Sequence, residues 1–130
     1  MNEKAAALRR RAQEFAVRLI RFVRTLPADP VTRELARQLA KAGSGMSANY
    51  HATCRARSRA EFIAKLGIVV GEADETEHWL RVPIDSSSAA GPEVQWLDTE
   101  AHELRAIFKA SLDTSRANHQ RQKLSHSPKS

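Results

Sequence analysis

The sequence predicts an all-α protein that folds as an antiparallel up-down-up-down four-helix bundle. Apolar residues recur at steps of three and four in four segments of similar length, which is the spacing of one face of an α-helix. Seven of the 130 residues are aromatic, so the core must be built mainly from Leu, Ile, Val and Ala, a mixture that suits packed helices. No segment alternates with a period of two over a useful length, so we expect no sheet.

The first helix is expected over residues 4–26. Its apolar face covers Leu8–Leu26 in alternating steps of four and three, a spacing that suits packing at a shallow crossing angle. Pro27 follows directly, and because proline cannot continue a helix, it should end the segment.

The second helix is expected over residues 30–54, with Asp29 as its N-cap and an apolar face over Val31–Tyr50. It contains Gly43 and Gly45, each of which costs about 1 kcal/mol relative to Ala in a helix interior. Small residues surround both glycines. We interpret them as a close approach of a neighbouring helix to a continuous helix; a break in the helix is the alternative.

The third helix is expected over residues 58–82. Ser58 followed by Glu61 forms a capping box, in which each side chain accepts a hydrogen bond from a backbone N–H at the helix start. The apolar face covers Phe62–Leu80, and Pro83 should end the helix.

A loop is expected at residues 83–92, followed by a fourth helix over 92–117 with an apolar face over Val94–Leu112. The bundle would then occupy residues 1–118 as a single domain, which the chain length allows. Residues 119–130 are polar and basic, and we predict a disordered tail there.

Charge is unevenly distributed along the chain, which carries a net charge of +6. The net charge is +5 over residues 1–26, +4 over 27–66, −8 over 67–104 and +5 over 105–130. Such asymmetry favours partners that are steered by charge, either nucleic acid or a second copy of the protein.

The chain has the signals of a cytoplasmic protein. Its single cysteine, Cys54, permits no internal disulfide, which fits a reducing compartment. No apolar stretch approaches the roughly 20 residues that span a bilayer, and arginines interrupt the N-terminal segment, so we expect neither a membrane partner nor a signal peptide.

Clustered arginines make nucleic acid the leading candidate ligand, because arginines neutralise phosphates. Along the sequence, no aromatic residue is interleaved with them in a stacking pattern, and no helix-turn-helix signature is present. A solvated or self-associating surface is the alternative. The candidates form three groups in the first helix, the second helix and the turn that follows it: Arg18, Arg21 and Arg24; Arg33, Arg37 and Lys41; Arg55, Arg57 and Arg59.

Self-association is the second candidate. An acidic band in the third helix faces outward in this interpretation and would meet the basic faces of another copy, and two tryptophans off the main apolar faces would anchor the contact. The alternative is that both tryptophans fold over the ends of the bundle. The candidate interface residues are Glu72, Glu75, Trp79 and Trp96, with Asp74 and Glu77 in the same band.

Metal binding and catalysis have little support. Glu75 and His78 have the i, i+3 spacing of di-iron bundles, but such sites need two of these motifs and two further glutamates. His51 with Cys54 does not complete a zinc site, and no glycine-rich phosphate loop or nucleophile elbow is present. We therefore expect a protein that is not an enzyme and has no cofactor and no metal.

The middle of the chain resembles a known bacterial family. The stretches that carry the resemblance are 38–49, which ends at Asn49, then 55–62, which contains Ser58, Glu61 and Phe62, and the Glu-rich run 71–80. Over about residues 12–112 the chain is similar to the four-helix bundle proteins related to those encoded by intervening sequences in 23S rRNA genes. The usual Ser-Ile pair of that family is replaced here by Gly45 and Met46.

The resemblance implies a four-helix bundle without established catalytic activity, often assembled as a homo-oligomeric ring and commonly as a homopentamer. It also implies roles in association with nucleic acid or the ribosome. Combined with the basic helix faces, it leads us to expect a non-enzymatic oligomeric accessory protein that binds RNA or DNA. The alternative is a homo-oligomeric protein–protein interaction scaffold with no nucleic-acid ligand.

Overall fold

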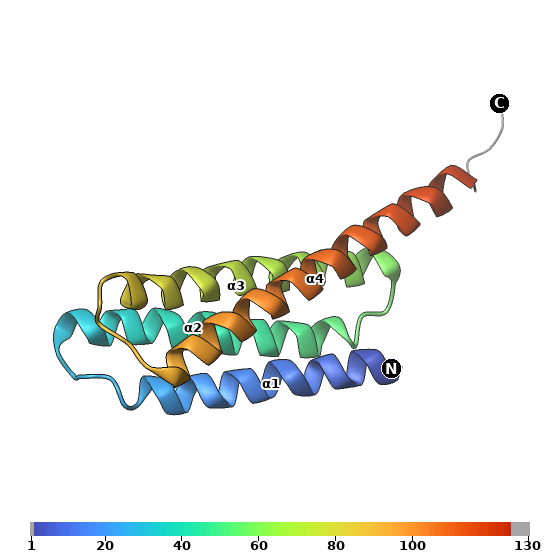
Figure 1. Ribbon diagram of the computed structural model, residues 1–130. Helices are drawn as coiled ribbons and strands as arrows, with labels where there is room; N and C mark the ends of the chain where they lie inside the picture. The colour runs from blue at the N-terminus through green and yellow to red at the C-terminus, as the bar shows by residue number, and fades with distance from the viewer. Residues whose placement is uncertain (1, 126–130) are drawn as a thin grey trace.

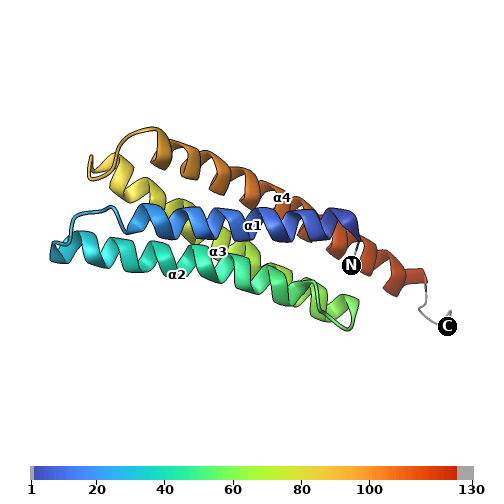
Figure 2. The ribbon, with the colours of Figure 1, turned by 90° about the horizontal axis from the view of Figure 1, so that it is seen from below.

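The computed structural model of the protein describes residues 2–125, which form four helices and no strand (Figure 1). The helices are α1 (Glu3–Val23), α2 (Pro30–Thr53), α3 (Arg59–Asp85) and α4 (Pro92–Ser125). Each packs against the next along the chain, and α4 also contacts α1 (Figure 2). The predicted all-α four-helix bundle is therefore confirmed, and the alternating helix directions agree with an up-down-up-down order.

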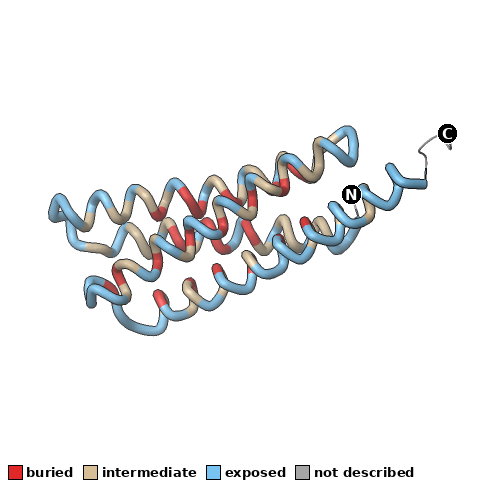
Figure 3. The backbone as a smooth tube through the Cα atoms, turned by 90° about the horizontal axis from the view of Figure 1, so that it is seen from above, coloured by how far each residue is buried: buried red, intermediate tan, exposed pale blue. Residues whose placement is uncertain are grey.

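The core lies where the inner faces of the four helices meet (Figure 3). Phe15 of α1 and Phe108 of α4 are fully buried, and the ring of Tyr50 lies 4.9 Å from that of Phe108, centroid to centroid. Most of the predicted inward positions are buried or half-buried. Val31 is the exception at 71% exposure, because it stands in the first turn of α2.

The first helix is shorter than predicted, since it ends at Val23 rather than at residue 26. The backbone N–H of Thr25 donates to the carbonyl of Phe22 at 2.9 Å and that of Leu26 to the carbonyl of Val23 at 3.2 Å. Each bond reaches back three residues instead of four, so the chain tightens from an α-helix into 3₁₀-type turns. Pro27 explains this change, because the residue before a proline is disfavoured in the α conformation.

The second helix is continuous, and its predicted N-cap is confirmed. The Asp29 carboxylate accepts a hydrogen bond from the backbone N–H of Thr32 at 3.0 Å. The helix passes through Gly43 and Gly45 without a break, and both glycines have neighbours that explain them. A Cβ atom at Gly43 would overlap Leu19 of α1, and one at Gly45 would lie 2.9 Å from the Glu72 carboxylate of α3.

The third helix begins as predicted but ends later. The Ser58 hydroxyl accepts a hydrogen bond from the backbone N–H of Glu61 at 3.0 Å. The prediction that Pro83 ends the helix is wrong, because the helix continues to Asp85 with Pro83 buried in its last turn. The Pro83 carbonyl accepts the N–H of Ser88 at 2.8 Å, so the turn is closed around the proline.

The predicted disordered tail is wrong for residues 119–125, which continue α4 as a helix to Ser125. This segment contains Gln, Arg, Lys and Leu and neither Gly nor Pro, so its intrinsic helix propensity is high. Residues 126–130 lie outside the described part of the chain. Beyond Leu112 no described side chain is buried, and the end of α4 projects past the other helices (Figures 1 and 2).

Candidate nucleic-acid interface

The basic residues of α2 lie on its outer face. Arg33, Arg37 and Lys41 are exposed, on the side of the helix away from the buried Leu39 and Ala42. Arg37 is engaged within its own helix, because its guanidinium donates two hydrogen bonds to the Glu34 carboxylate. These bonds, and after them the hydrogen bond from a neighbouring glutamine, lower the pKa of Glu34 to about 2. Lys41 lies near Glu72 of α3 and favours its ionised form. Arg33 therefore has the least competition for a ligand in this group.

The three predicted arginines of α1 do not act alike. Arg21 and Arg24 are exposed and line a groove of about 360 Å³ between α1 and Ser44 of α2. The Arg18 guanidinium instead binds Glu93 of α4, with Nε donating to Oε1 at 2.7 Å and Nη2 to Oε2 at 3.0 Å. Arg18 is thus held on α4, while Arg21 and Arg24 point to solvent.

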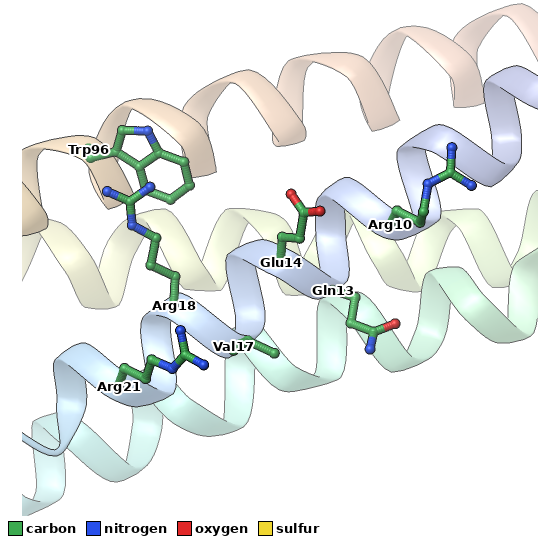
Figure 4. Close-up of a pocket in the computed structure, with 7 residues that line it drawn as sticks. All are labelled: Arg10, Gln13, Glu14, Val17, Arg18, Arg21 and Trp96. Atoms are coloured by element: carbon green, nitrogen blue, oxygen red, sulfur yellow. The ribbon is translucent and has the colours of Figure 1, made fainter.

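A second groove, of about 450 Å³, lies between α1 and α4 (Figure 4). Arg18 covers the ring of Trp96 there, with its guanidinium carbon 3.6 Å from the ring centroid. Arg10 and Arg21 line the same groove. The fold therefore places an aromatic ring among arginines that are distant from it in sequence.

Sequence reasoning missed this groove. Arg10 and Arg21 are eleven residues apart, about three helical turns, so the spacing already placed them on one face of α1. Trp96 had no comparable signal, because no basic residue lies near it along the chain and its place beside Arg18 depends on how α4 packs on α1.

The third basic group lies at the opposite end of the bundle from the turn between α1 and α2. Arg55, Arg57 and Arg59 are exposed in the turn between α2 and α3 (Figure 1). Arg59 lines a notch of about 410 Å³ that also contains Ser115 and Asn118 of α4. The three predicted groups therefore form two separate basic regions, one along α1 and α2 and one at this end.

The acidic residues are largely bound within the chain. Glu77 of α3 accepts a hydrogen bond from Arg105 of α4 and pairs with His102, whose Nδ1 lies 2.6 Å from the carboxylate. Arg81 reaches Asp98 at 2.8 Å. These pairs join α3 to α4, so much of the negative charge of this half of the protein is already compensated.

The predicted oligomer interface is only partly available. Trp79 and Trp96 are half-buried and pack against the core of their own chain. Glu72 lies against Gly45, and burial first, then the nearby charge of Glu75, raises the pKa of the Glu72 carboxyl. Glu75 is the exposed member of the four predicted residues.

The outer face of α3 carries a different apolar feature. Ile68 is 54% exposed and stands beside Gly67 and near Gly71, at which an added Cβ would have no neighbour within 4 Å. Among the residues that the structure describes, no neighbouring atom requires glycine at either position. Sequence reasoning passed over them because it followed only the inward face.

The remaining predicted residues have structural contacts. Asn49 is half-buried, and its backbone carbonyl accepts the Thr53 hydroxyl at 2.7 Å. Phe62 is half-buried and packs on the core next to the Ser58 cap. Among the described residues, no group of three or more His, Cys, Asp or Glu side chains is arranged to hold a metal ion. Within the same residues, no helix is long and apolar enough to cross a membrane.

Two comparisons with known proteins agree with each other. The model of the family described as 23S rRNA-intervening sequence protein matches residues 4–110. A crystal structure of a protein of unknown function from the S23 ribosomal protein family of Bacteroides thetaiotaomicron is similar, with a TM-score of 0.76 and 26% sequence identity. The match covers 85% of this chain and 98% of that one. No curated protein gives a significant match.

Proposed function

We propose that this chain, which belongs to the family of 23S rRNA-intervening sequence proteins, is a non-enzymatic, homo-oligomeric accessory protein of the cytoplasm that binds RNA or DNA. The binding surface is the basic outer side formed by α1 and α2. The proposal rests on four arginines of this side that form no ion pair with any described residue: Arg10, Arg21, Arg24 and Arg33.

The register of α1 against α4 explains why these cations remain. Arg11 and Arg18 are seven residues apart and face α4, where they bind Glu100 and Glu93, which are also seven residues apart. The arginines on the outward side of α1 are beyond the reach of that ladder. Exposed cations without carboxylate partners release counterions when they bind phosphates, which drives association with nucleic acid.

The grooves support binding rather than catalysis. Those lined by Arg21 are open depressions over helix surfaces, whereas a substrate pocket is a concave site that buries most of its ligand. The bundle centre is filled by side chains such as Phe15 and Met46.

The test is a titration of labelled RNA and DNA against the full chain at two salt concentrations. The variant Arg21→Gln with Arg33→Gln should weaken binding and reduce the salt slope by about 1.4 to 1.8, the value for two lost phosphate contacts. The matched control, Gln95→Glu with Thr99→Glu, changes the net charge equally on an exposed part of α4. Absence of binding at low ionic strength, or an equal loss in the control, would overturn the proposal.

The second candidate is a homo-oligomeric scaffold with no nucleic-acid ligand. The observation that favours it is the exposed Ile68 with Gly67 and Gly71 on the outer face of α3, where a helix of another copy could approach closely. The family resemblance implies a ring, commonly a pentamer. The titration separates the two candidates, because the scaffold binds neither RNA nor DNA, and light scattering tests the assembly that both candidates require.

A further inference from the structure

The groove between α1 and α4 holds one arginine in a fixed plane (Figure 4). The guanidinium carbon of Arg18 lies 3.6 Å from the centroid of the Trp96 ring, which is a stacking distance, and Trp96 itself packs against the core. Both carboxylate oxygens of Glu93 accept hydrogen bonds from the same guanidinium. The Arg18 side chain nevertheless stays 43% exposed and lines the groove, so the face of its guanidinium that is turned away from the ring is open.

An open guanidinium plane suits a planar ligand better than a phosphate. The charge of Arg18 is already compensated by Glu93, which binds two of its N–H groups, so the groove is left with the flat face rather than with the charge. Unpaired nucleobases bind by stacking on aromatic rings or on arginine guanidinium planes. A base on Arg18 would complete a stack of three layers, with Trp96 as the innermost.

The same groove offers contacts for the backbone of a strand. Arg10 and Arg21 line it, are exposed and form no ion pair with any described residue. They lie eleven residues apart, about 16 Å along α1, with Arg18 between them. Val17, which is 43% exposed, lies between them as well and provides an apolar contact for a sugar or a base.

Glu14 argues against a ligand that is only an anion. It lines the groove between Arg10 and Trp96, and it forms no ion pair with any described residue (Figure 4). Its carboxylate would repel a phosphate or an acidic peptide, but it can accept hydrogen bonds from the amino groups of bases. A strand that carries phosphates and bases together satisfies both the arginines and Glu14.

We infer that the groove between α1 and α4 binds single-stranded nucleic acid, with one base stacked on the Arg18 guanidinium over Trp96. Arg10 and Arg21 then bind neighbouring phosphates, and the strand continues from Arg21 onto the basic side of α1 and α2. A duplex does not suit this arrangement, because its bases stack on one another and their faces are covered. The inference rests on the proposed function and narrows its ligand to unpaired RNA or DNA, whose bases offer the same stacking face.

The experiment measures how much the bases contribute to binding by the full chain. The probes are a labelled DNA strand of mixed sequence and about 12 nucleotides, the same strand with abasic sites throughout, its duplex with the complement, and the RNA strand of that sequence. The abasic strand carries the same phosphates, so it reports the electrostatic part of the affinity alone.

The variants remove the stacking plane without removing charge. Arg18→Lys keeps the positive charge but has no planar face. The matched control is Arg81→Lys, since Arg81 also binds an α4 carboxylate, that of Asp98 at 2.8 Å, but does not line the groove. Trp96→Leu removes the ring beneath the guanidinium, whereas Trp96→Phe retains one. Thermal unfolding of each variant is measured alongside, because Trp96 packs on the core.

We expect the parent to bind the DNA strand about tenfold or more tightly than the abasic strand, which is the effect of one stacked base. It should also bind the strand more tightly than the duplex. Arg18→Lys and Trp96→Leu should abolish the preference for the base-bearing strand, whereas Trp96→Phe and Arg81→Lys should retain it. The RNA strand should lose affinity in Arg18→Lys as the DNA strand does, and the ratio of the two affinities in the parent identifies the preferred strand.

Equal affinity of the parent for the base-bearing and abasic strands would overturn the inference, and so would equal affinity for the duplex. If Arg18→Lys retains the preference for bases, the base stacks elsewhere and the assignment to this groove is wrong. If both strands bind equally and Arg21→Gln with Arg33→Gln weakens both, the proposed function stands and only the inference fails. If the parent binds no probe at low salt, both fail.

Discussion

Replacing Gly43 by alanine should destabilise the protein, although alanine is the better helix former. Gly43 is buried where α2 meets α1, and a Cβ atom there would overlap Cδ2 of Leu19, which is itself fully buried. Helix propensity would contribute about 1 kcal/mol of stabilisation. Forcing an extra methyl group into a packed core costs about 1 to 3 kcal/mol. The expected net loss is about 1 kcal/mol, or about 4 °C in the unfolding midpoint.

The sign of this effect should reverse when Leu19 is truncated. Leu19→Ala alone should cost about 2 to 5 kcal/mol, because it leaves a cavity in the core. In that background Gly43→Ala meets no side chain closer than Phe15 Cε1 at 3.7 Å, which is ordinary contact, so it should stabilise the protein by about 1 kcal/mol. The double-mutant cycle should thus give a coupling of about 2 kcal/mol.

The assay is urea unfolding followed by circular dichroism at low protein concentration. Gly71→Ala serves as the control, because Gly71 is exposed and an added Cβ has no neighbour within 4 Å. It should stabilise the monomer by about 1 kcal/mol. If Gly43→Ala stabilises the parent protein as Gly71→Ala does, α1 and α2 do not approach each other as closely as described.

Three further predictions concern titration and assembly. Burial raises the pKa of Tyr50, the only tyrosine, so stability should fall as pH rises above about 10, with phenolate absorbance appearing only as the protein unfolds. The pKa of Glu72 is raised mainly by burial, so Glu72→Gln should raise the unfolding midpoint at neutral pH. That gain should vanish below about pH 4, where the carboxyl is protonated in both states. Ile68→Glu should reduce the mass measured by light scattering without lowering helix content, if α3 forms the contact between copies, and an unchanged mass would exclude this face.

The local signals in the sequence predicted much of the fold. The side chains of Asp29 and Ser58 each accept a hydrogen bond from the backbone N–H three residues later, at the start of the helix that they cap. Their role therefore depends only on the few residues that follow them. The apolar spacing likewise identifies an inward face without reference to the rest of the chain. Val31 shows the limit of this rule, because whether a first-turn residue is covered depends on where the neighbouring helix ends.

The errors arise where tertiary packing decides. Pro83 stays helical because its ring is buried in the last turn of α3, and no sequence rule tells whether a proline ring will find that cover. The polar end of α4 is helical although the same composition is typical of disorder, since helix propensity and chain entropy nearly balance there.

Most of the candidate site could be predicted as a set of residue types but not as a surface. The sequence placed Arg18, Arg21 and Arg24 in one group because they share a helix. The structure separates them, since Arg18 binds Glu93 and Trp96 whereas Arg21 and Arg24 stay exposed. That separation depends on the register of α1 against α4. This register is determined by contacts between residues that are 75 positions apart in the sequence.

The order of the helices therefore decides which charges remain for a partner. Because α4 returns beside α1, the acidic half of the chain meets the most basic helix, and Glu93 and Glu100 bind the two arginines that face them. On the outer face of α2, Glu34 binds Arg37 within the helix and Glu72 of α3 lies near Lys41, but all three cations stay exposed and Arg33 forms no ion pair among the described residues. If positive and negative charges were simply summed along the sequence, this difference between the faces of α1 and α2 would disappear. An antiparallel bundle preserves it, because only side chains on facing surfaces can pair.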